Sequence, residues 1–309
     1  MCSVIEDRDE QIQIIKRRKL NPVSEIRNSD GKLIYTGQMK DGKKDGNGMS
    51  VYADDGKPVY IGMWKNDVYD GFGKIFVGED MYFECEFKKG KRNGNTKMWM
   101  DGKLQFETQY KDGEKNGIQK NYLNDKLTTE MIYIDGKREG TEKEYHANEK
   151  LKRETQYKDD EKNGTEKEYH TNGKLKRETQ YKDDMKNGIE KEYHMFGNLK
   201  RETQYKDDEK NGTEKEYTNG TLKRETQYKD DKKNGTEKEY HANRETQYKD
   251  DKKNGTEKEY HTNGKLKRET RYKNDKKNGT EKEYNASGQL ERKAIYYANG
   301  QINGMPIIW

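Results

Sequence analysis

The chain has 309 residues, of which only 27% are hydrophobic and 40% are charged. This composition excludes a thick hydrophobic core and leaves a thin structure in which each segment contacts only its neighbours. The formal net charge is +5, and lysine and arginine alternate with aspartate and glutamate along the chain, so specific nucleic-acid binding is not expected.

Residues 1–30 come before the clear repeats, and we assign them as an N-terminal cap segment. Within them, residues 11–16 alternate between polar and apolar side chains, which is typical of a strand. Such a strand would cover the first open edge of a sheet. A short helix over residues 5–19 is the alternative.

From residue 31 onward the sequence is a tandem repeat, because Tyr157, Tyr181 and Tyr205 follow one another at intervals of 24 residues. Each copy has a large anchor residue, a glycine seven residues later and a second large residue twelve residues later. The anchors are Met39, Trp64, Phe87, Tyr110, Tyr133, Tyr157, Tyr181, Tyr205, Tyr228, Tyr248, Tyr272 and Tyr297. The glycines are Gly46, Gly71, Gly94, Gly117, Gly140, Gly164, Gly188, Gly212, Gly235, Gly255, Gly279 and Gly304.

The copies at the start of the array are rich in glycine. One of them reads Tyr60-Ile61-Gly62-Met63-Trp64, then a polar turn, then Gly71-Phe72-Gly73. This sequence pattern resembles the MORN repeat, and the preceding copy is similar, with Met39 in place of the tryptophan. We assign residues 31–100 to glycine-rich MORN repeats.

The later copies are similar to the degenerate MORN variant of the bacterial YwqK antitoxin family, whose copies also share a tandem Asn-Gly-Lys-Leu wording. We assign residues 101–309 to a degenerate MORN-variant repeat array with a C-terminal cap, which we place in the apolar residues 305–309. The resemblance implies a repeat protein and, in this family, neutralisation of a toxin.

The fold class expected from these repeats is all-β: an elongated, solenoid-like antiparallel β-meander of about twelve MORN-type hairpin repeats. Alternation along one strand places Leu175, Arg177, Thr179 and Tyr181 on one face. In the strand of residues 165–169, we expect Thr165, Lys167 and Tyr169 to share the face of Tyr157.

We predict a hairpin in which Tyr157 lies opposite Tyr169, with Lys162-Asn163-Gly164 as a three-residue loop whose glycine has positive φ. This register would pair Lys158 with Glu168 and Asp159 with Lys167, and it would place Asp160 unfavourably against Glu166. A second loop at residues 172–174 returns the chain to the next copy. One copy is shortened, because Tyr228 and Tyr248 are only 20 residues apart, and we expect a local kink or a tightened turn near Ala242 and Asn243.

Candidate chemical groups are few. Histidines recur after the second aromatic residue, but equivalent positions lie about 10 Å apart across two strands, too far to share a metal ion. The paired carboxylates repeat in every copy beside lysines, so we predict a solvated face rather than catalysis. Cys2 and Cys85 are predicted to be free thiols. We expect no cofactor, no metal and no enzymatic activity.

The face that interleaves tyrosine and arginine is the candidate binding surface. Its residues are Tyr157, Tyr169, Arg177, Tyr181, Tyr193, Arg201, Tyr205, Tyr217, Arg224 and Tyr228. The alternative is that these rings form the core by stacking on the next copy, with cation–π support.

We therefore predict a non-enzymatic repeat scaffold that binds a protein partner, with an antitoxin or immunity role as the specific form of this function. The alternative is a membrane-associated tether that contacts phospholipid. No leader-like or long apolar segment stands in the sequence, so a cytoplasmic location is expected, and a peripheral membrane location accompanies the alternative.

Overall fold

The computed structural model describes residues 23–308, so residues 1–22 and 309 are outside the described part of the chain. Contacts divide the chain into an N-terminal unit, residues 1–152 with 156–161, and a C-terminal unit, residues 153–155 with 162–309. The predicted strand or helix before residue 20 lies outside the described residues. The same holds for Cys2 and Trp309.

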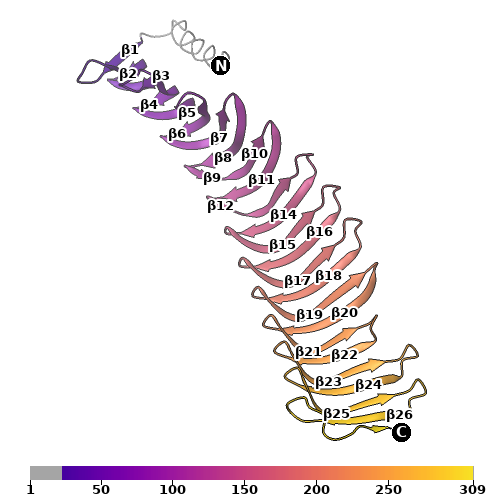
Figure 1. Ribbon diagram of the computed structural model, residues 1–309. Coiled ribbons are helices and arrows are strands. Elements are labelled where there is room, and N and C mark those ends of the chain that lie inside the picture. The colour runs from indigo at the N-terminus through magenta and orange to yellow at the C-terminus, as the bar shows by residue number, and fades with distance from the viewer. Residues whose placement is uncertain (1–22, 309) are drawn as a thin grey trace. The chain divides into compact units, whose positions relative to one another are not determined.

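Every regular element within residues 23–308 is a β-strand (Figure 1). The strands of the N-terminal unit are β1 (Ser24–Arg27), β2 (Leu33–Lys40), β3 (Lys43–Val51), β4 (Pro58–Lys65), β5 (Val68–Val77), β6 (Met81–Lys88), β7 (Lys91–Met100), β8 (Lys103–Lys111), β9 (Glu114–Lys115), β10 (Gly117–Leu123), β11 (Lys126–Ile134), β12 (Lys137–Arg138) and β13 (Gly140–Tyr145). Strand β14 (Leu151–Lys158) contains residues of both units.

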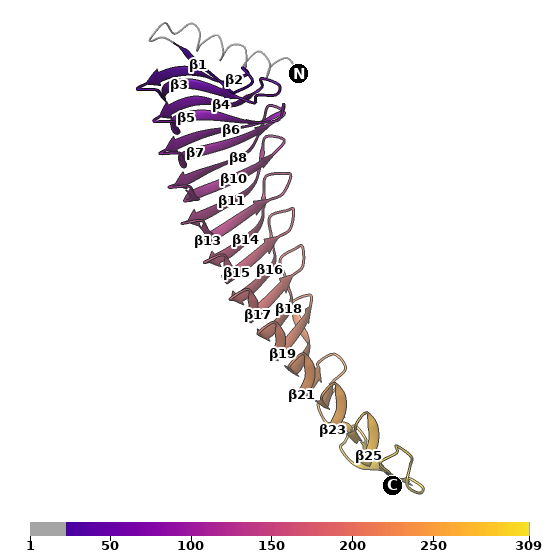
Figure 2. The ribbon, with the colours of Figure 1, turned by 90° about the vertical axis from the view of Figure 1, so that its left-hand side faces the viewer.

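The strands of the C-terminal unit are β15 (Glu161–Tyr169), β16 (Leu175–Lys182), β17 (Met185–Tyr193), β18 (Leu199–Lys206), β19 (Glu209–Thr218), β20 (Thr221–Lys229), β21 (Lys232–Glu239), β22 (Arg244–Lys249), β23 (Lys252–Tyr260), β24 (Leu266–Lys273), β25 (Lys276–Tyr284), β26 (Leu290–Tyr296) and β27 (Ile307–Ile308). In each unit, neighbouring strands pair antiparallel, as β2 does with β3 and β16 with β17 (Figure 2). Strands β9 and β10 both pair with β8, and β12 and β13 both pair with β11. The expected all-β antiparallel meander of hairpin repeats is confirmed.

The hairpin turns are shorter than the sequence predicted. Between β16 and β17, Lys182 pairs with Met185, and the two turn residues Asp183 and Asp184 have φ of 50° and 65°. This is the two-residue hairpin turn with positive φ at both central positions, which asparagine and aspartate tolerate better than other residues with a side chain. Residues 159 and 160 have the same geometry, with φ of 52° and 74°.

The predicted three-residue loop at Lys162-Asn163-Gly164 is therefore wrong, because these residues lie inside β15. The predicted facing of Tyr157 and Tyr169 is wrong for the same reason, as are the pairs of Lys158 with Glu168 and of Asp159 with Lys167. The equivalent anchor Tyr181 faces Lys186. Nor does the expected repulsion at Asp160 arise, since its carboxylate accepts the backbone N–H of Arg138 at 2.9 Å.

Successive turns are tied to one another by the second aspartate of each pair. Asp184 Oδ1 accepts the backbone N–H of Lys162 at 2.7 Å, while its own N–H donates to the Lys162 carbonyl at 3.0 Å. Asp208 bonds to both backbone groups of Lys186 in the same way. Each turn thus satisfies the backbone of the hairpin before it, which explains why aspartate recurs at this position.

The repeated glycine has the positive φ that was predicted, but it forms a bulge inside a strand. Gly188 has φ of 118° and pairs with Tyr205, and the register with the preceding strand shifts beside it. Gln180 lies over the bulge, and its side-chain oxygen accepts the backbone N–H of Ile189 at 2.8 Å. A Cβ atom on Gly188 would meet this oxygen.

The second loop has the predicted position. The backbone N–H of His170 donates to the carbonyl oxygen of Lys174 at 2.8 Å, and Gly173 has φ of 89°. The shortened copy also has the expected tightened turn, because β21 ends at Glu239 and β22 begins at Arg244. In the last copy the anchor is Tyr296 and not Tyr297, since Gly279 pairs with Tyr296 while Tyr297 is exposed.

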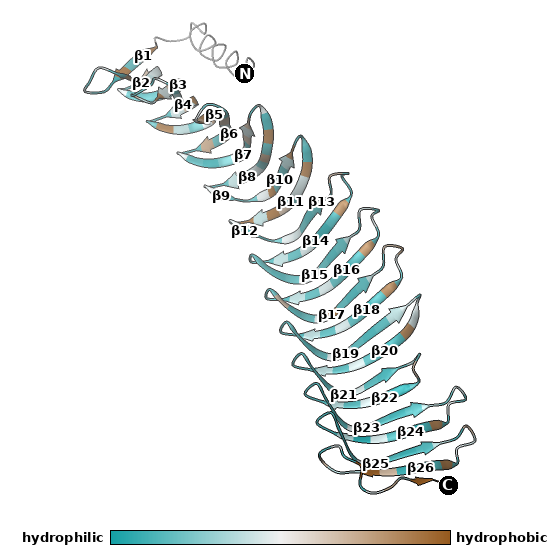
Figure 3. Cartoon of the chain, viewed as in Figure 1, coloured by the Kyte–Doolittle hydropathy of each residue, from teal (hydrophilic) through white to brown (hydrophobic). Residues whose placement is uncertain are grey.

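The two faces of the sheet differ. We call the face that carries the buried Thr155, Thr179 and Thr203 the threonine face; Thr96 and Thr108 hold the equivalent position in the N-terminal unit. There this face also carries an apolar cluster of Tyr35, Tyr60, Trp64, Cys85 and Phe87, and a second cluster of Met49, Val51, Ile61 and Phe76 lies on the opposite face. The strands of the C-terminal unit are mostly hydrophilic (Figure 3).

In the glycine-rich copies, aromatic rings pack directly on the sheet backbone. Trp64 meets Tyr35 and Tyr60 edge to face, with ring centroids 5.5 and 5.2 Å apart. A Cβ atom at Gly48 would overlap the Tyr35 ring, so only glycine permits this packing. This is the physical content of the Gly-x-Gly pattern in the sequence.

We predict that Gly188→Ala lowers the free energy of unfolding by about 1–3 kcal/mol, because the alanine would have positive φ and would also displace Gln180. The matched control is Gly264→Ala, which also has positive φ but has no atom within 4 Å of the added Cβ. Urea unfolding followed by circular dichroism measures both variants. Equal destabilisation of the two would contradict a packing role for the glutamine.

Candidate binding surface

The threonine face of the C-terminal unit is built from three rows of complementary side chains. Strands of the β16 type carry arginine, threonine and tyrosine on this face, and strands of the β17 type carry lysine and two glutamates. In the register of β16 with β17, these residues meet as Arg177 with Glu192, Thr179 with Glu190 and Tyr181 with Lys186. On the other side of β16, Glu168 faces Arg177 and Glu166 faces Thr179.

The central row buries a glutamate in each copy. Glu190 is 4% exposed and accepts hydrogen bonds from the Thr179 hydroxyl at 3.1 Å and from Lys186 Nζ at 2.7 Å. The same arrangement recurs within residues 153–308 at Glu166, Glu190, Glu214, Glu237, Glu257 and Glu281. Because each carboxylate has a cation and a hydroxyl as partners, its burial is tolerated.

The second row alternates lysine and tyrosine. Lys186 Nζ lies 4.7 Å from the ring centroid of Tyr205, and Lys162 lies equally close to the ring of Tyr181. Burial, and then the charges of neighbouring glutamates, raise the pKa of Tyr181, Tyr205 and Tyr228 to about 12. These phenols are neutral at physiological pH and act as ring surfaces for the lysines.

The third row pairs arginine with glutamate. Arg201 Nη2 donates to Glu192 Oε1 at 2.7 Å, and Arg224 donates to Glu216 at 2.6 Å. Burial raises the pKa of the Glu192 carboxyl, but the hydrogen bond and charge of Arg201 outweigh it, so the pKa is lowered overall. The three rows thus pair with one another within the sheet, but the buried Nε–H groups of Arg177, Arg201 and Arg224 have no hydrogen-bond acceptor.

The predicted binding residues do not form one column. Arg177, Arg201, Arg224, Tyr181, Tyr205 and Tyr228 lie on the threonine face. Tyr157 holds the equivalent position in the N-terminal unit, where the Arg138 guanidinium lies 4.1 Å from its ring centroid. Tyr169, Tyr193 and Tyr217 point to the opposite face, and the Tyr169 hydroxyl donates to Glu154 at 2.9 Å.

The expected sharing of one face by Tyr169, Arg177 and Tyr181 is therefore wrong, as is the placement of Thr165 and Lys167 on that face. The reason is the two-residue turn, because a change of one residue in register moves every side chain of a strand to the other face. A binding role for the ten residues stays a prediction.

The sequence pattern predicts a solvated face for these glutamates, whereas the structure buries them, and the sequence also contains a signal for the buried position. Glu166 stands nine residues after its anchor, as Gly48 and Gly73 do in the first copies. Those glycines lie under the rings of Tyr35 and Tyr60. The position nine residues after the anchor is therefore buried under a ring in the first copies, and the same position is expected to be buried in the later copies, where it is glutamate.

The opposite face carries a row in which lysine and glutamate alternate from strand to strand, and we call it the alternating-charge face. Lys167 faces Glu178, which faces Lys191, which faces Glu202. The ion pairs are loose, with 3.7 Å between Lys167 and Glu178 and 4.0 Å between Lys191 and Glu202. Exposed pairs of this kind contribute little to stability.

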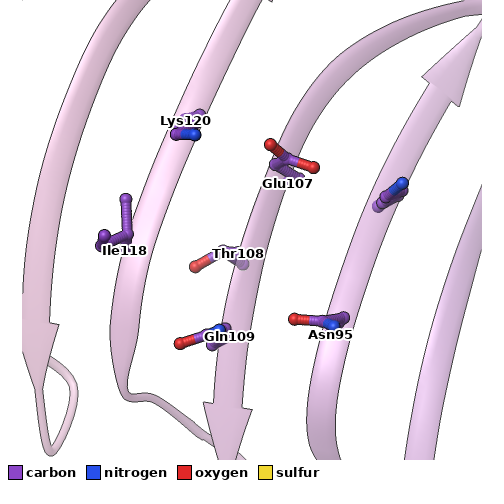
Figure 4. A pocket seen from close by; sticks show the side chains of 7 residues that line it. Asn95, Glu107, Thr108, Gln109, Ile118 and Lys120 are labelled. Atoms are coloured by element: carbon purple, nitrogen blue, oxygen red, sulfur yellow. The ribbon is translucent and has the colours of Figure 1, made fainter.

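In the N-terminal unit, the alternating-charge face is hollowed across β7, β8 and β10 (Figure 4). The depression has a volume of about 320 Å³ and is lined by Asn95, Lys97, Glu107, Gln109, Ile118 and Lys120. Ile118 faces Ile132 on the neighbouring strand, and they are 44% and 39% exposed. An exposed apolar pair therefore borders a polar depression.

The histidines belong to the loop edge of the sheet, where His261 Nε2 lies 2.9 Å from the carbonyl oxygen of Tyr284. Within residues 23–308, no group of three or more histidine, cysteine, aspartate or glutamate side chains is placed to hold a metal ion. Cys85 is buried with a free thiol, and burial raises its pKa. In the same residues, no helix is long and apolar enough to cross a bilayer.

We predict that Glu214→Ala lowers the free energy of unfolding by about 2–4 kcal/mol, because Lys210 and Thr203 lose their shared buried acceptor. The matched control is Glu202→Ala on the alternating-charge face, whose partner Lys191 is 4.0 Å away. Its expected effect is below about 1 kcal/mol. Chemical unfolding compares the two, and a larger loss for the control would contradict the assignment of the buried row.

The buried glutamates also make the stability of the fold depend on pH. Burial raises the pKa of Glu237, Glu257 and Glu281, but hydrogen bonds and charges from their lysines outweigh it and lower each pKa overall. A carboxyl whose pKa is lower in the folded state stabilises the fold above its unfolded pKa, and this stability is lost as the pH falls through the folded pKa.

We therefore expect the thermal midpoint to fall by more than about 5 °C between pH 7 and pH 3, as measured by circular dichroism. Glu257→Gln is the control variant, because it removes one titrating carboxyl and should reduce the fall. A midpoint that stays constant or rises on acidification would show that the buried carboxylates do not stabilise the array.

Comparison with known proteins supports the repeat assignment. The family described as MORN repeat variant matches residues 138–159, 162–183, 186–207, 210–230, 253–274 and 277–299. These segments leave a gap at residues 231–252, where the shortened copy lies. No curated protein matches the chain.

Two crystal structures show a distant likeness. The structure of TcdB2-TccC3-TEV is 12% identical over 92% of this chain and 16% of that chain, with a TM-score of 0.17. The structure of TcdB2-TccC3-Cdc42 is 11% identical over 88% of this chain and 18% of that chain, with a TM-score of 0.13. This chain thus spans less than a fifth of either, and such low TM-scores carry no argument. The family match and the repeating hairpins together establish that the chain belongs to the proteins built from MORN-variant repeats.

Proposed function

We propose that the chain is a non-enzymatic scaffold that binds a protein partner through the alternating-charge face of its N-terminal unit. The observation that carries this proposal is a row of positions on that face in which two separate pairs of side chains are apolar and exposed, with Glu86, Asn95 and Gln109 between the pairs. Met63, Phe72, Ile118 and Ile132 are all exposed there. The equivalent positions in the C-terminal unit are mostly threonine or glutamine, such as Thr213 and Gln204.

The surroundings of this row favour a protein over a small charged ligand. Lys97, Glu107 and Lys120 alternate in sign across β7, β8 and β10, and Tyr122 donates to Glu107 at 2.8 Å. A mixed surface of apolar groups, amides and both charges is typical of protein interfaces. Charges that alternate in sign do not produce a concentrated positive potential of the kind that attracts anionic lipid or nucleic acid.

The absence of enzymatic activity is part of the proposal. The titratable groups of the C-terminal unit repeat in identical surroundings and pair with one another, as Glu190 does with Lys186 and Thr179. Catalysis requires groups whose environment sets them apart. As a specific form of the function, we propose a toxin as the partner, which rests on the resemblance to the YwqK antitoxin family.

The test is affinity capture with the tagged full chain, followed by mass spectrometry. We expect a stoichiometric protein to be retained by the wild type and reduced about tenfold by Ile118→Lys with Ile132→Lys, since burying two charges costs at least about 1.4 kcal/mol. Thr213→Lys, at the same row position in the C-terminal unit, is the matched control and should retain the partner.

Two outcomes would count against this function. Capture at low salt that returns no stoichiometric protein would remove the proposal. Co-flotation of the chain with anionic vesicles, without any retained protein, would instead favour a phospholipid-contacting tether.

A further inference from the structure

The shortened copy in the C-terminal unit lacks a packing partner that the neighbouring copies have. In the complete copies, the second tyrosine lies opposite a leucine: Tyr193 faces Leu199, Tyr217 faces Leu222 and Tyr260 faces Leu266. In the shortened copy, Tyr240 is followed by His241-Ala242-Asn243-Arg244, and the segment that would bring the leucine is missing.

The missing segment leaves a cavity. Tyr240 is 44% exposed, whereas Tyr193, Tyr217 and Tyr260 are half-buried. The space beside it has a volume of about 230 Å³, and its lining includes Tyr240, Asn243, Arg244, Glu245, Tyr260 and His261. The tight turn is held in place, since the Tyr260 backbone N–H donates to the Asn243 carbonyl at 2.8 Å.

Most polar groups around the cavity already have partners in the chain. The Tyr240 hydroxyl donates to Glu225 at 3.2 Å, and the Tyr260 hydroxyl donates to Glu245 at 3.4 Å. Arg244 Nη2 donates to Glu239 Oε2 at 2.6 Å. With these groups engaged, the surface that lines the cavity is more apolar than polar, which suits an apolar occupant better than an ion.

We propose that this cavity receives one large apolar side chain, a leucine or an aromatic residue, from the protein partner. The volume is below the range of about 300–1,000 Å³ typical of small-molecule sites and suits a single anchoring side chain. The occupant takes the place of the leucine that lies opposite the tyrosine in the complete copies. This inference rests on the proposed function as a protein-binding scaffold, and it adds a second contact in the C-terminal unit.

The test is to insert the missing segment, so that a leucine of the chain itself occupies the cavity. Insertion of Gly-Lys-Leu-Lys between Asn243 and Arg244 restores the wording of the complete copy at residues 261–268. The probes are N-acetyl-leucinamide and N-acetyl-phenylalaninamide, with N-acetyl-asparaginamide as the polar control, and saturation-transfer NMR detects their binding. We expect both apolar probes to bind the wild type, and their signal to fall about fivefold or more in the insertion variant, equivalent to about 1 kcal/mol.

Two substitutions locate the probe. Tyr240→Ala should weaken probe binding, whereas Tyr284→Ala, which changes the tyrosine opposite Leu290 in a complete copy, should leave it unchanged. Circular dichroism confirms that each variant is folded. Equal probe signals in the wild type and the folded insertion variant would overturn the inference, as would binding of the polar control to the same extent.

The outcome is separable from that of the proposed function. If affinity capture returns a partner that the insertion variant retains as well as the wild type does, the cavity is not the anchor and the inference falls, while the scaffold function stands. If no partner is captured, the scaffold function falls, and the loss of probe signal on insertion still reports on the cavity.

Discussion

The structure depends on one constraint, the two-residue aspartate turn that fixes how neighbouring strands face each other. With Asp183 and Asp184 in the turn, Tyr181 meets Lys186, and the alternation of the strands then brings Thr179 to Glu190 and Arg177 to Glu192. Because two kinds of strand alternate along the meander, each of these side chains has a complementary neighbour on both sides. Each added copy therefore extends all three rows at once, as expected of a structure stabilised by nearest-neighbour contacts.

The interior of a repeat is filled in two ways. In the first copies a ring lies over glycines, as Tyr35 lies over Gly48. In the later copies the ring is replaced by arginine, and the glycine positions are occupied by threonine and glutamate, which hydrogen-bond to each other and to a lysine. The volume that a tyrosine ring fills over two glycines in the first copies is thus filled by arginine, threonine and glutamate side chains in the later copies. This explains how a chain with 27% hydrophobic residues has an ordered interior.

The regular copies offer few polar groups to a ligand. Arginine, glutamate, lysine and tyrosine of the threonine face have partners in the same sheet, so their regular columns offer few groups to a ligand. The places that offer something are departures from the repeat. Ile118 and Ile132 expose apolar groups where most copies of the C-terminal unit have threonine and glutamine, and Tyr240 lacks the leucine that lies opposite its equivalents. The candidate binding sites therefore lie where the copies differ.

The sequence by itself determined the all-β repeat, the position of the return loop at residues 172–174 and the positive φ of glycines such as Gly188, because these follow from local chemistry that recurs in every copy. The tertiary structure decided the turn length, and with it the face of each side chain. The difference between Lys162-Asn163-Gly164 and Asp159-Asp160 as the turn is small in sequence, yet it moves Glu166 from solvent to the interior and separates Tyr169 from Tyr181. Because side chains along a strand alternate between the two faces, a register change of one residue moves every side chain of the strand to the other face. The cavity beside Tyr240 likewise required coordinates, because a deletion in the sequence does not show whether the neighbouring loops close over the gap.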